Sequence, residues 1–96
     1  MDPAIPDITI SDVVESTAGR DHGEWFYVVH EDPVYLFLAN GKDRTLDKPK
    51  RKKRKHVQKV LRSETRVAEK LRHGDKVLNG ELRRDLAFLA RETTSE

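Results

Sequence analysis

The fold is decided by the stretch Glu24-Trp-Phe-Tyr-Val-Val-His30, Glu31-Asp-Pro33 and Val34-Tyr-Leu-Phe-Leu-Ala39. The first and last of these segments are rich in aromatic and β-branched residues, which predicts two strands. Pro33 fixes its own φ and disfavours helical backbone at the residue before it, so the middle segment predicts a tight reversal. Together they predict an antiparallel pair of strands.

Further short strands are expected on both sides of this pair. Upstream, Asp12–Ser16 predicts a first strand, and Thr17–Gly23 contains two glycines and no large apolar residue, which predicts a turn. Downstream, Asn40-Gly41 is the dipeptide most typical of a two-residue hairpin turn, after which Arg44–Leu46 is expected to pair back as a fourth strand. His56–Val60 alternates again and predicts a closing fifth strand.

The last third of the chain changes to a helical period. Glu64–His73 places Val67 and Leu71 four residues apart, with Ser63 as the expected N-cap and Gly74 as the expected stop. A second helix is expected to start at Asn79, acting as its cap, with Glu81 in the first turn. Its buried face is expected to comprise Leu82, Leu86, Leu89 and Ala90.

These elements predict a mainly β fold with an α appendage: a small antiparallel barrel followed by two short C-terminal helices. The barrel is expected over residues 8–62, with a basic insert at 48–55. The helical appendage is expected over residues 63–92 and, because neither helix is long enough to be stable alone, it should pack on the barrel.

Length and composition narrow the class of protein. The chain has 96 residues, enough for one domain, and 38% of them are charged, against a usual fraction of about 25%. The longest apolar run, Val34 to Ala39, is too short to cross a membrane. Met1-Asp2-Pro3 lacks the pattern of a signal peptide, and there is no cysteine to form a disulfide. We therefore expect a soluble cytoplasmic protein with no membrane association.

Charge is segregated along the chain. Residues 1–40 carry one basic and eight acidic residues, residues 41–62 carry eleven basic and two acidic, and residues 63–96 carry seven of each. The formal net charge of +2 thus hides one strongly cationic segment. Such asymmetry indicates a polyanionic partner that touches one part of the surface.

The basic run Lys48–Lys55 contains seven Lys or Arg in eight residues, and mutual repulsion predicts an extended, mobile segment when it is free. A solvated loop or a localisation signal would also produce such a run. Its position inside the predicted barrel favours phosphate contact, and so does its mixture of Arg with Lys. Lys42 and Arg44 before it, with Lys59 and Arg62 after it, extend one electropositive edge. Nucleic acid is therefore the favoured partner.

Trp25, Phe26 and Tyr27 are consecutive on a predicted strand, so they cannot all face one core. Phe26 and Val28 share one face, and Trp25, Tyr27 and Val29 share the other. One interpretation is that Trp25 or Tyr27 stacks on an unpaired base. The alternative is that the C-terminal helices cover them, and the apolar faces of those helices favour this second interpretation.

The sequence gives little support for catalysis. The four histidines match no metal-binding spacing, and Asp21-His-Gly-Glu24 is a turn composition that is common without any ligand. There is no phosphate-binding loop of the Walker type, nucleophile elbow or HExxH sequence. We expect no enzyme activity, catalytic residue, metal or cofactor.

The stretch Asp12-Val-Val-Glu-Ser-Thr-Ala-Gly-Arg-Asp-His-Gly23, followed by Phe26 and Val28, resembles a KOW motif, with Gly23 at the fixed glycine of its loop. The chain as a whole is similar to bacterial KOW-domain RNA-binding proteins related to the large-subunit ribosomal protein fourteen family of eukaryotes and archaea. The segments that extend the resemblance are residues 34–41, Arg44–Leu46, residues 49–57, which include the basic insert, and Asn79–Arg83.

The resemblance implies an SH3-like barrel that binds ribosomal RNA of the large subunit as a non-catalytic, ribosome-associated translation protein. It places Arg20 and His22 near the RNA, and an exposed edge strand beside a basic loop favours a monomer. Gly19, Gly23 and Gly41 are the expected turn glycines. The full set of expected RNA-binding residues is Arg20, His22, Lys42, Arg44, Lys48, Lys50, Arg51, Lys52, Lys53, Arg54, Lys55 and Lys59.

An alternative function is a KOW-type protein–protein adaptor in the transcription or translation machinery. It rests on aromatic candidates for a protein surface and on the acidic first half of the chain, which suits a protein that also meets another protein. Adaptor binding would depend on Trp25, Tyr27 or the helices and would survive high salt better than RNA binding. The acidic residues concerned are Asp12, Glu15, Asp21, Glu24, Glu31 and Asp32.

Overall fold

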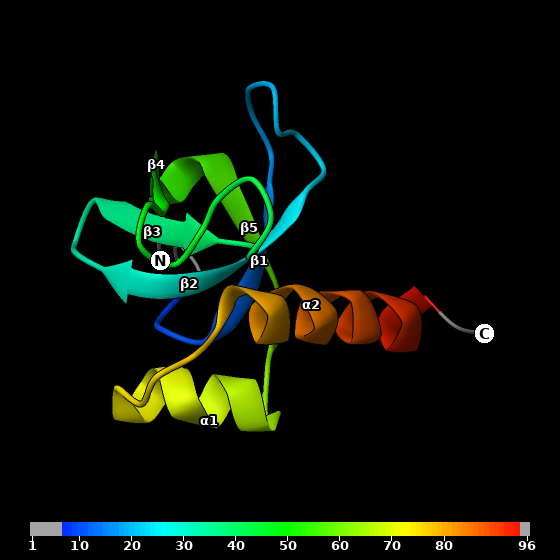
Figure 1. Cartoon of the computed structure of the whole chain (residues 1–96). Coiled ribbons are helices and arrows are strands. Elements are labelled where there is room, and N and C mark those ends of the chain that lie inside the picture. Colours follow the sequence, from blue (N-terminus) through cyan, green and yellow to red (C-terminus); the bar gives the residue numbers. More distant parts are fainter. Residues whose placement is uncertain (1–6, 95–96) are drawn as a thin grey trace.

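The computed structural model describes residues 7–94 and contains one antiparallel sheet of five strands (Figure 1). The order of the strands across the sheet is β4-β3-β2-β1-β5. Each hydrogen-bonded pair is antiparallel. The strands are β1 (Asp12–Ser16), β2 (Trp25–Glu31), β3 (Tyr35–Ala39), β4 (Lys50–Lys53) and β5 (Val57–Arg62).

A short 3₁₀ helix, η1 (Arg54–His56), connects the two edge strands β4 and β5. Because the connection is so short, the sheet must curl until its edges approach each other. Backbone hydrogen bonds hold this corner: Arg54 donates to the carbonyl of Val34 (3.0 Å), and Thr17 donates to the carbonyl of His56 (2.9 Å). The pairing within residues 7–94 leaves β4 and β5 as the two edges of the curled sheet, joined through η1.

Two helices, α1 (Arg66–His73) and α2 (Asn79–Thr94), follow the sheet and lie together on one side of it (Figure 1). The predicted mainly β fold with a helical appendage is confirmed. Neither helix in the described part of the chain is both long and apolar enough to cross a bilayer.

The alternation along the strands builds one apolar cluster on each side of the sheet. Phe26 and Val28 point into the curl, and Tyr27 points toward the helices, as the period of two requires. The inner cluster comprises Ile8, Val14, Phe26, Val28, Leu36, Leu38 and Val57. The cluster between sheet and helices comprises Val13, Tyr27, Ala39, Val67, Ala68, Leu82 and Leu86.

The basic run differs from the prediction of a mobile insert. Lys50–Lys53 is strand β4, paired in register with β3, and the next three residues form η1. The predicted fourth strand over Arg44–Leu46 is wrong, because residues 40–49 are a loop that contains no strand. Pairing with the apolar strand β3 thus overrides the repulsion within the run.

The loop after β3 is longer than the predicted two-residue turn because it packs against the start of α2. Gly41 has φ +77°, and a Cβ built there would lie 2.2 Å from the carbonyl oxygen of Asn79. The backbone N–H of Leu46 donates to the Asn79 side chain at 2.8 Å. The helix therefore fixes the path of the loop, and Asn79 contacts the loop instead of capping its own helix.

The helix ends show one further correction. Thr65, not Ser63, caps α1, because its hydroxyl accepts from the N–H of Ala68 (3.2 Å). Gly74 ends α1 in the left-handed conformation, as expected. At the start of α2 the carboxylate of Glu81 accepts from the N–H of Leu78 at 2.9 Å, which satisfies a donor at the helix N-terminus.

Candidate nucleic-acid interface

The lysines on the inner side of β4 form ion pairs with a carboxylate of the same chain. Lys52 lies opposite Leu36, a fully buried residue, and is itself only 7% exposed. Its ammonium lies 2.7 Å from the Asp21 carboxylate and donates to the carbonyl of Ala18 at 2.7 Å. Lys50 forms an ion pair with the other oxygen of Asp21 at 2.9 Å. Both lysines therefore serve the fold, and the buried Lys52 is not accessible to a phosphate.

Asp21 is the acceptor of these contacts and is held in its ionised form. Burial alone would raise its pKa, but hydrogen bonds from Lys52, Lys50 and Ser16 outweigh that effect and hold the pKa far below the ordinary value of 3.8. The Ser16 hydroxyl donates at 2.7 Å. These contacts tether the loop between β1 and β2 to strand β4, although the two segments are far apart in sequence.

The tethered loop, residues 17–24, carries two of the predicted RNA-binding residues. Arg20 and His22 flank Asp21 and are both exposed. Gly23 has φ +92°, and a Cβ built there would meet nothing within 4 Å, so the backbone conformation alone requires glycine. Gly19 also has a positive φ. The predicted roles of the turn glycines agree with these backbone angles.

The outer side of β4 combines cations with the aromatic residues of β3. Lys53 lies opposite Tyr35, and Arg51 lies opposite Phe37. The guanidinium carbon of Arg51 sits 4.4 Å from the centre of the Tyr35 ring. His30 adds a third ring, 5.2 Å from Phe37 between centroids. We call His30, Tyr35, Phe37, Arg51 and Lys53 the aromatic–basic face.

Arg54 is the most fully occupied of the predicted RNA-binding residues. Its guanidinium donates to the carbonyls of Asp32 (3.0 Å) and Ile8 (2.9 Å) and to the carboxylate of Glu31 (3.1 Å). These bonds fix η1 to the loop between β2 and β3 and to the segment before β1. The neighbouring Lys55 is exposed and forms no ion pair with the described residues.

Lys59, on β5, is also paired within the chain. Its ammonium lies 3.3 Å from the carboxylate of Asp12, which has no exposed surface. Arg62 donates to the same carboxylate at 3.1 Å. Two cations therefore neutralise one buried acid on β1, and this pairing ties β5 to its neighbour.

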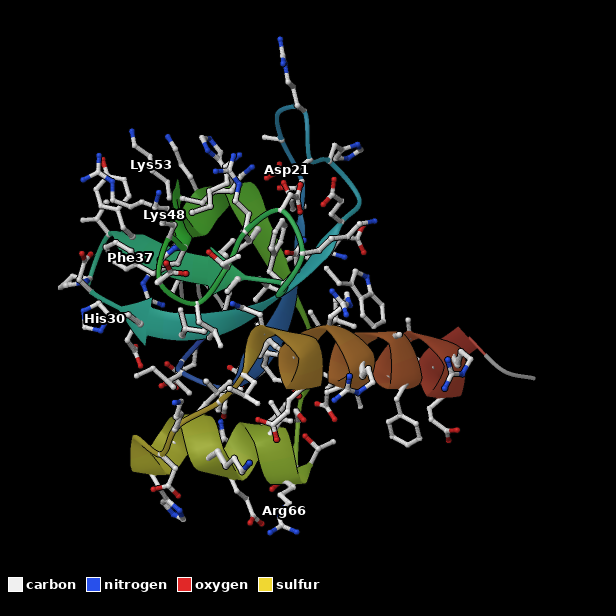
Figure 2. The ribbon with its side chains drawn as sticks, viewed as in Figure 1. Asp21, His30, Phe37, Lys48, Lys53 and Arg66 are labelled. Carbon is white, nitrogen blue, oxygen red and sulfur yellow. The ribbon has the colours of Figure 1, made fainter. Side chains whose placement is uncertain are left out.

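The remaining cations form the outer surface. Lys42, Arg44 and Lys48 come from the loop between β3 and β4, are exposed, and make no ion pair with any described residue. Arg20 and Arg44 line one shallow hollow, so their two loops meet. Figure 2 shows Lys48 and Lys53 on the side of the molecule away from α1. The cationic surface consists of Arg20, Lys42, Arg44, Lys48, Arg51, Lys53 and Lys55, and the exposed ring of His22 lies beside Arg20 in the same loop.

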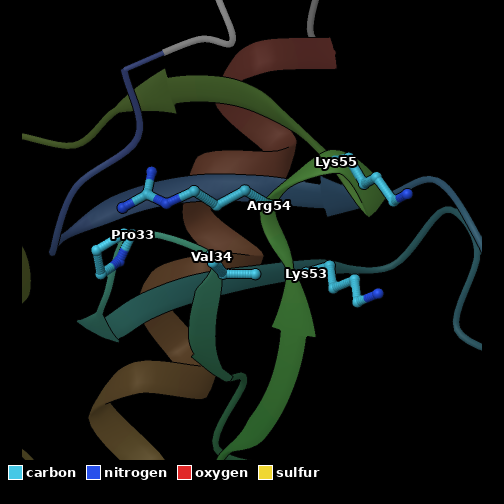
Figure 3. A pocket seen from close by; sticks show the side chains of 5 residues that line it. All are labelled: Pro33, Val34, Lys53, Arg54 and Lys55. Carbon is cyan, nitrogen blue, oxygen red and sulfur yellow. The ribbon is translucent and has the colours of Figure 1, made fainter.

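A small apolar hollow lies within this surface, beside the turn between β2 and β3. Pro33 and Val34 form its floor, and Val34 is 54% exposed. Figure 3 shows Lys53 and Lys55 extending to one side of the hollow while Arg54 points to the other. Apolar contact and positive charge therefore occur side by side at this edge.

Trp25 and Tyr27 lie on the helix side of the sheet, away from the aromatic–basic face. Tyr27 is fully buried; its hydroxyl lies 2.8 Å from Ser63 Oγ and hydrogen-bonds to the carboxylate of Asp85 on α2. Burial and the Asp85 carboxylate raise the pKa of Tyr27 well above its ordinary value of 10. Trp25 is half-buried against the same apolar cluster. The helices therefore cover both rings, as the favoured interpretation predicted.

The sequence reasoning missed His30, Tyr35 and Phe37. The alternation of β3 predicts the position of two of them. Leu36 and Leu38 are apolar and share the inner side of the strand, so Tyr35 and Phe37 lie on the outer side. His30 depends on an irregularity of pairing that the sequence does not reveal. Within residues 7–94, no group of three His, Asp or Glu side chains lies close enough to hold a metal ion.

Comparison with known proteins gives no family assignment. No protein-family model matches the chain, and no curated protein matches it significantly.

Proposed function

We propose that this protein is a non-catalytic RNA-binding protein that docks on ribosomal RNA of the large subunit through the cationic surface. The resemblance of residues 12–23 to a KOW motif gives the reason for choosing ribosomal RNA. The geometry gives the reason for choosing a polyanion, since cations from three segments gather at one edge of the sheet.

One observation carries the proposal: the ion-paired acids of the first half of the chain draw on five basic residues, whereas the other six basic residues of the segment 41–62 form no ion pair with the described residues. Asp12, Asp21 and Glu31 each form ion pairs with cations of β4, η1 or β5. The cationic surface retains its positive charge without a partner in residues 7–94. An array of exposed Lys and Arg that makes no internal pairs is what phosphate binding requires.

The same observation weakens the adaptor alternative. An adaptor surface needs accessible side chains, but the acidic residues Asp12 and Asp21 are buried. Of the aromatic candidates, Tyr27 is fully buried beneath the helices. Arg54, Lys50, Lys52 and Lys59 are assigned to the fold in the present proposal, so the proposed phosphate contacts are fewer than the sequence predicted.

The mechanism is electrostatic. Each Lys or Arg that neutralises a phosphate releases condensed counterion, and the logarithm of affinity falls with the logarithm of salt by about 0.7 to 0.9 per contact. If roughly six of the exposed cations engage, the slope is expected to be near −4 to −5. The planar guanidinium groups of Arg20, Arg44 and Arg51 add bidentate donors to the point charges of the lysines.

The test is binding to purified large ribosomal subunits, measured by co-sedimentation over a series of salt concentrations. Wild type is expected to bind at low salt and to be released as salt rises. The triple variant Lys48→Ala, Lys53→Ala, Lys55→Ala should bind more weakly and show a slope reduced by about 2 to 3. Binding by wild type that does not respond to salt would contradict the proposal and favour the adaptor.

A matched control removes the same charge from the helix side. Arg66, Lys76 and Arg91 are exposed and make no ion pair with the described residues. Arg66 lies on the opposite side of the molecule from Lys53 (Figure 2). Changing these three to Ala should leave the slope unchanged. An equal loss in the control would show that only net charge matters, with no defined surface.

A further inference from the structure

The aromatic–basic face is a ladder of alternating rings and cations on two neighbouring strands. Tyr35 and Phe37 stand two residues apart on β3, and their partners on β4 are Lys53 and Arg51. Side chains two residues apart on one strand are separated by about 7 Å. Each of the two rings therefore has room to stack on a separate planar group. Each ring also has a cation beside it, at the distance of a cross-strand neighbour.

A β-bulge brings a third ring to this face. The pairing of β2 with β3 shifts between Val28 and His30, so that His30 pairs with Phe37. Without the shift, His30 would share the inward side with Val28, because residues two apart on a strand point the same way. The bulge turns His30 outward, where it is exposed and 5.2 Å from Phe37.

Neither apolar cluster of the fold uses these rings. Tyr35 and Phe37 belong to neither the inner cluster nor the helix-side cluster, and both are partly exposed. The helices, which cover Trp25 and Tyr27, leave this face open. The hydroxyl of Tyr35 makes no hydrogen bond to any described residue.

Arg51 packs on the ring of Tyr35 and forms no salt bridge with a described residue. Its guanidinium lies over the ring at 4.4 Å. Asp32, in the turn before β3, accepts from the backbone N–H groups of Val34 (2.9 Å) and Tyr35 (2.7 Å) and attracts Arg51 without forming a salt bridge. The face therefore offers exposed rings and positive charge together.

We propose that the aromatic–basic face stacks on unpaired bases, so that the protein prefers single-stranded RNA to duplex RNA at this contact. Aromatic side chains bind the faces of unpaired bases, which a continuous duplex does not offer, and flanking cations bind the backbone phosphates. This inference rests on the proposed function and adds to it the form of RNA recognised: a loop, bulge or single strand.

The test compares three synthetic RNA probes with wild type and variants by fluorescence anisotropy. The probes are a single strand of about 12 nucleotides, the same strand lacking its central bases, and the blunt duplex. The variant Tyr35→Leu with Phe37→Leu keeps apolar bulk but removes both rings. The control Phe88→Leu removes an aromatic residue that is 44% exposed on α2.

Wild type is expected to bind the single strand more tightly than either other probe. The double variant should lose about five- to hundredfold in affinity for the single strand and less than about twofold for the duplex, with an unchanged salt slope. Phe88→Leu should bind all three probes as wild type does. Circular dichroism verifies that the variants fold.

A measurement on wild type alone tests the stacking site even if the double variant fails to fold. In two-dimensional NMR spectra the ring protons of Tyr35 and Phe37 are expected to shift upfield when the single strand is added, and not when the duplex is added. Unshifted rings, or a double variant that loses affinity equally for single strand and duplex, would overturn the stacking site. Loss of binding in the Lys48, Lys53 and Lys55 variant would leave the proposed function standing in that case. A wild type that binds none of the probes overturns the stacking site, and the proposed function is then decided by co-sedimentation with large subunits.

Discussion

Lys52 and Lys53 are adjacent in the sequence and belong to two different regions of the molecule. Lys52, on the inner side of β4, is buried and bound to Asp21, whereas Lys53, on the outer side, is exposed and free of ion pairs within the described residues. The same division separates Lys50 from Arg51. A run of like charges on a strand is thus two populations, because successive side chains point to opposite sides. One population holds the sheet and its loops together, and the other faces solvent.

The strongest test of this difference removes one charge from the inner side of β4 and, separately, one charge from the outer side. Lys52→Met leaves Asp21 with one fewer partner in a buried position and should lower the free energy of unfolding by about 2 to 3 kcal/mol. Lys53→Met should change it by less than about 0.5 kcal/mol, since its side chain is solvated. Urea denaturation at neutral pH measures both. Equal losses would mean that the two sides of β4 are not distinct.

Acid titration examines the inner side through Asp21. Its pKa in the folded state lies below the ordinary value of 3.8, so its contribution to stability is present above about pH 4 and is lost as pH falls. Asp21→Asn should therefore be less stable than wild type at neutral pH by about 2 kcal/mol, and the difference should shrink toward pH 2.

The matched control for this titration is Glu24→Gln, because Glu24 is in the same loop but exposed and without an ion pair in residues 7–94. Its acid denaturation should follow that of wild type. A pH-independent difference between Asp21→Asn and wild type would show that the carboxylate charge has no part in tethering the loop.

The smallest effect is expected on the outer side, from Arg51→Lys. The charge is kept, but the planar group over Tyr35 is lost, so affinity for single-stranded RNA should fall by about two- to fivefold, which corresponds to about 0.5 to 1 kcal/mol. The salt slope and the free energy of unfolding should stay as in wild type. Anisotropy titrations measure the affinity, and an affinity equal to that of wild type would mean that Arg51 acts through its charge alone.

The first three strands and both helices were predictable because each carries its own periodic signal. Phe26 and Val28 against Tyr27 show the period of two, and Leu82 with Leu86 shows the period of a helix. The position of β4 was not predictable, because a strand of lysines and arginines has no apolar alternation to reveal which side faces inward. Its inner lysines depend on Asp21, whose approach results from the tertiary fold.

The sequence therefore identified the basic residues of the candidate site, but only partly which of them are exposed and which are paired within the fold. Arg20 and Lys48 are exposed, as an RNA contact requires, while Arg54 and Lys59 have partners that no local pattern indicates. The exposed side of β3 was within reach of sequence reasoning, because the alternation that buries Leu36 also turns Tyr35 outward.

The position of β1 between β2 and β5 has a consequence for how the chain folds. Its partners on β2 follow closely in sequence, but its partners on β5 come more than forty positions later. Closing so long a loop slows folding relative to the local hairpins, so β5 is expected to join last. Until Val57 and the residues after it arrive, β1 presents an open edge beside apolar Val13 and Val14, which is the arrangement most prone to pair with another chain. A polypeptide interrupted before β5 is thus expected to aggregate, whatever RNA it would have bound.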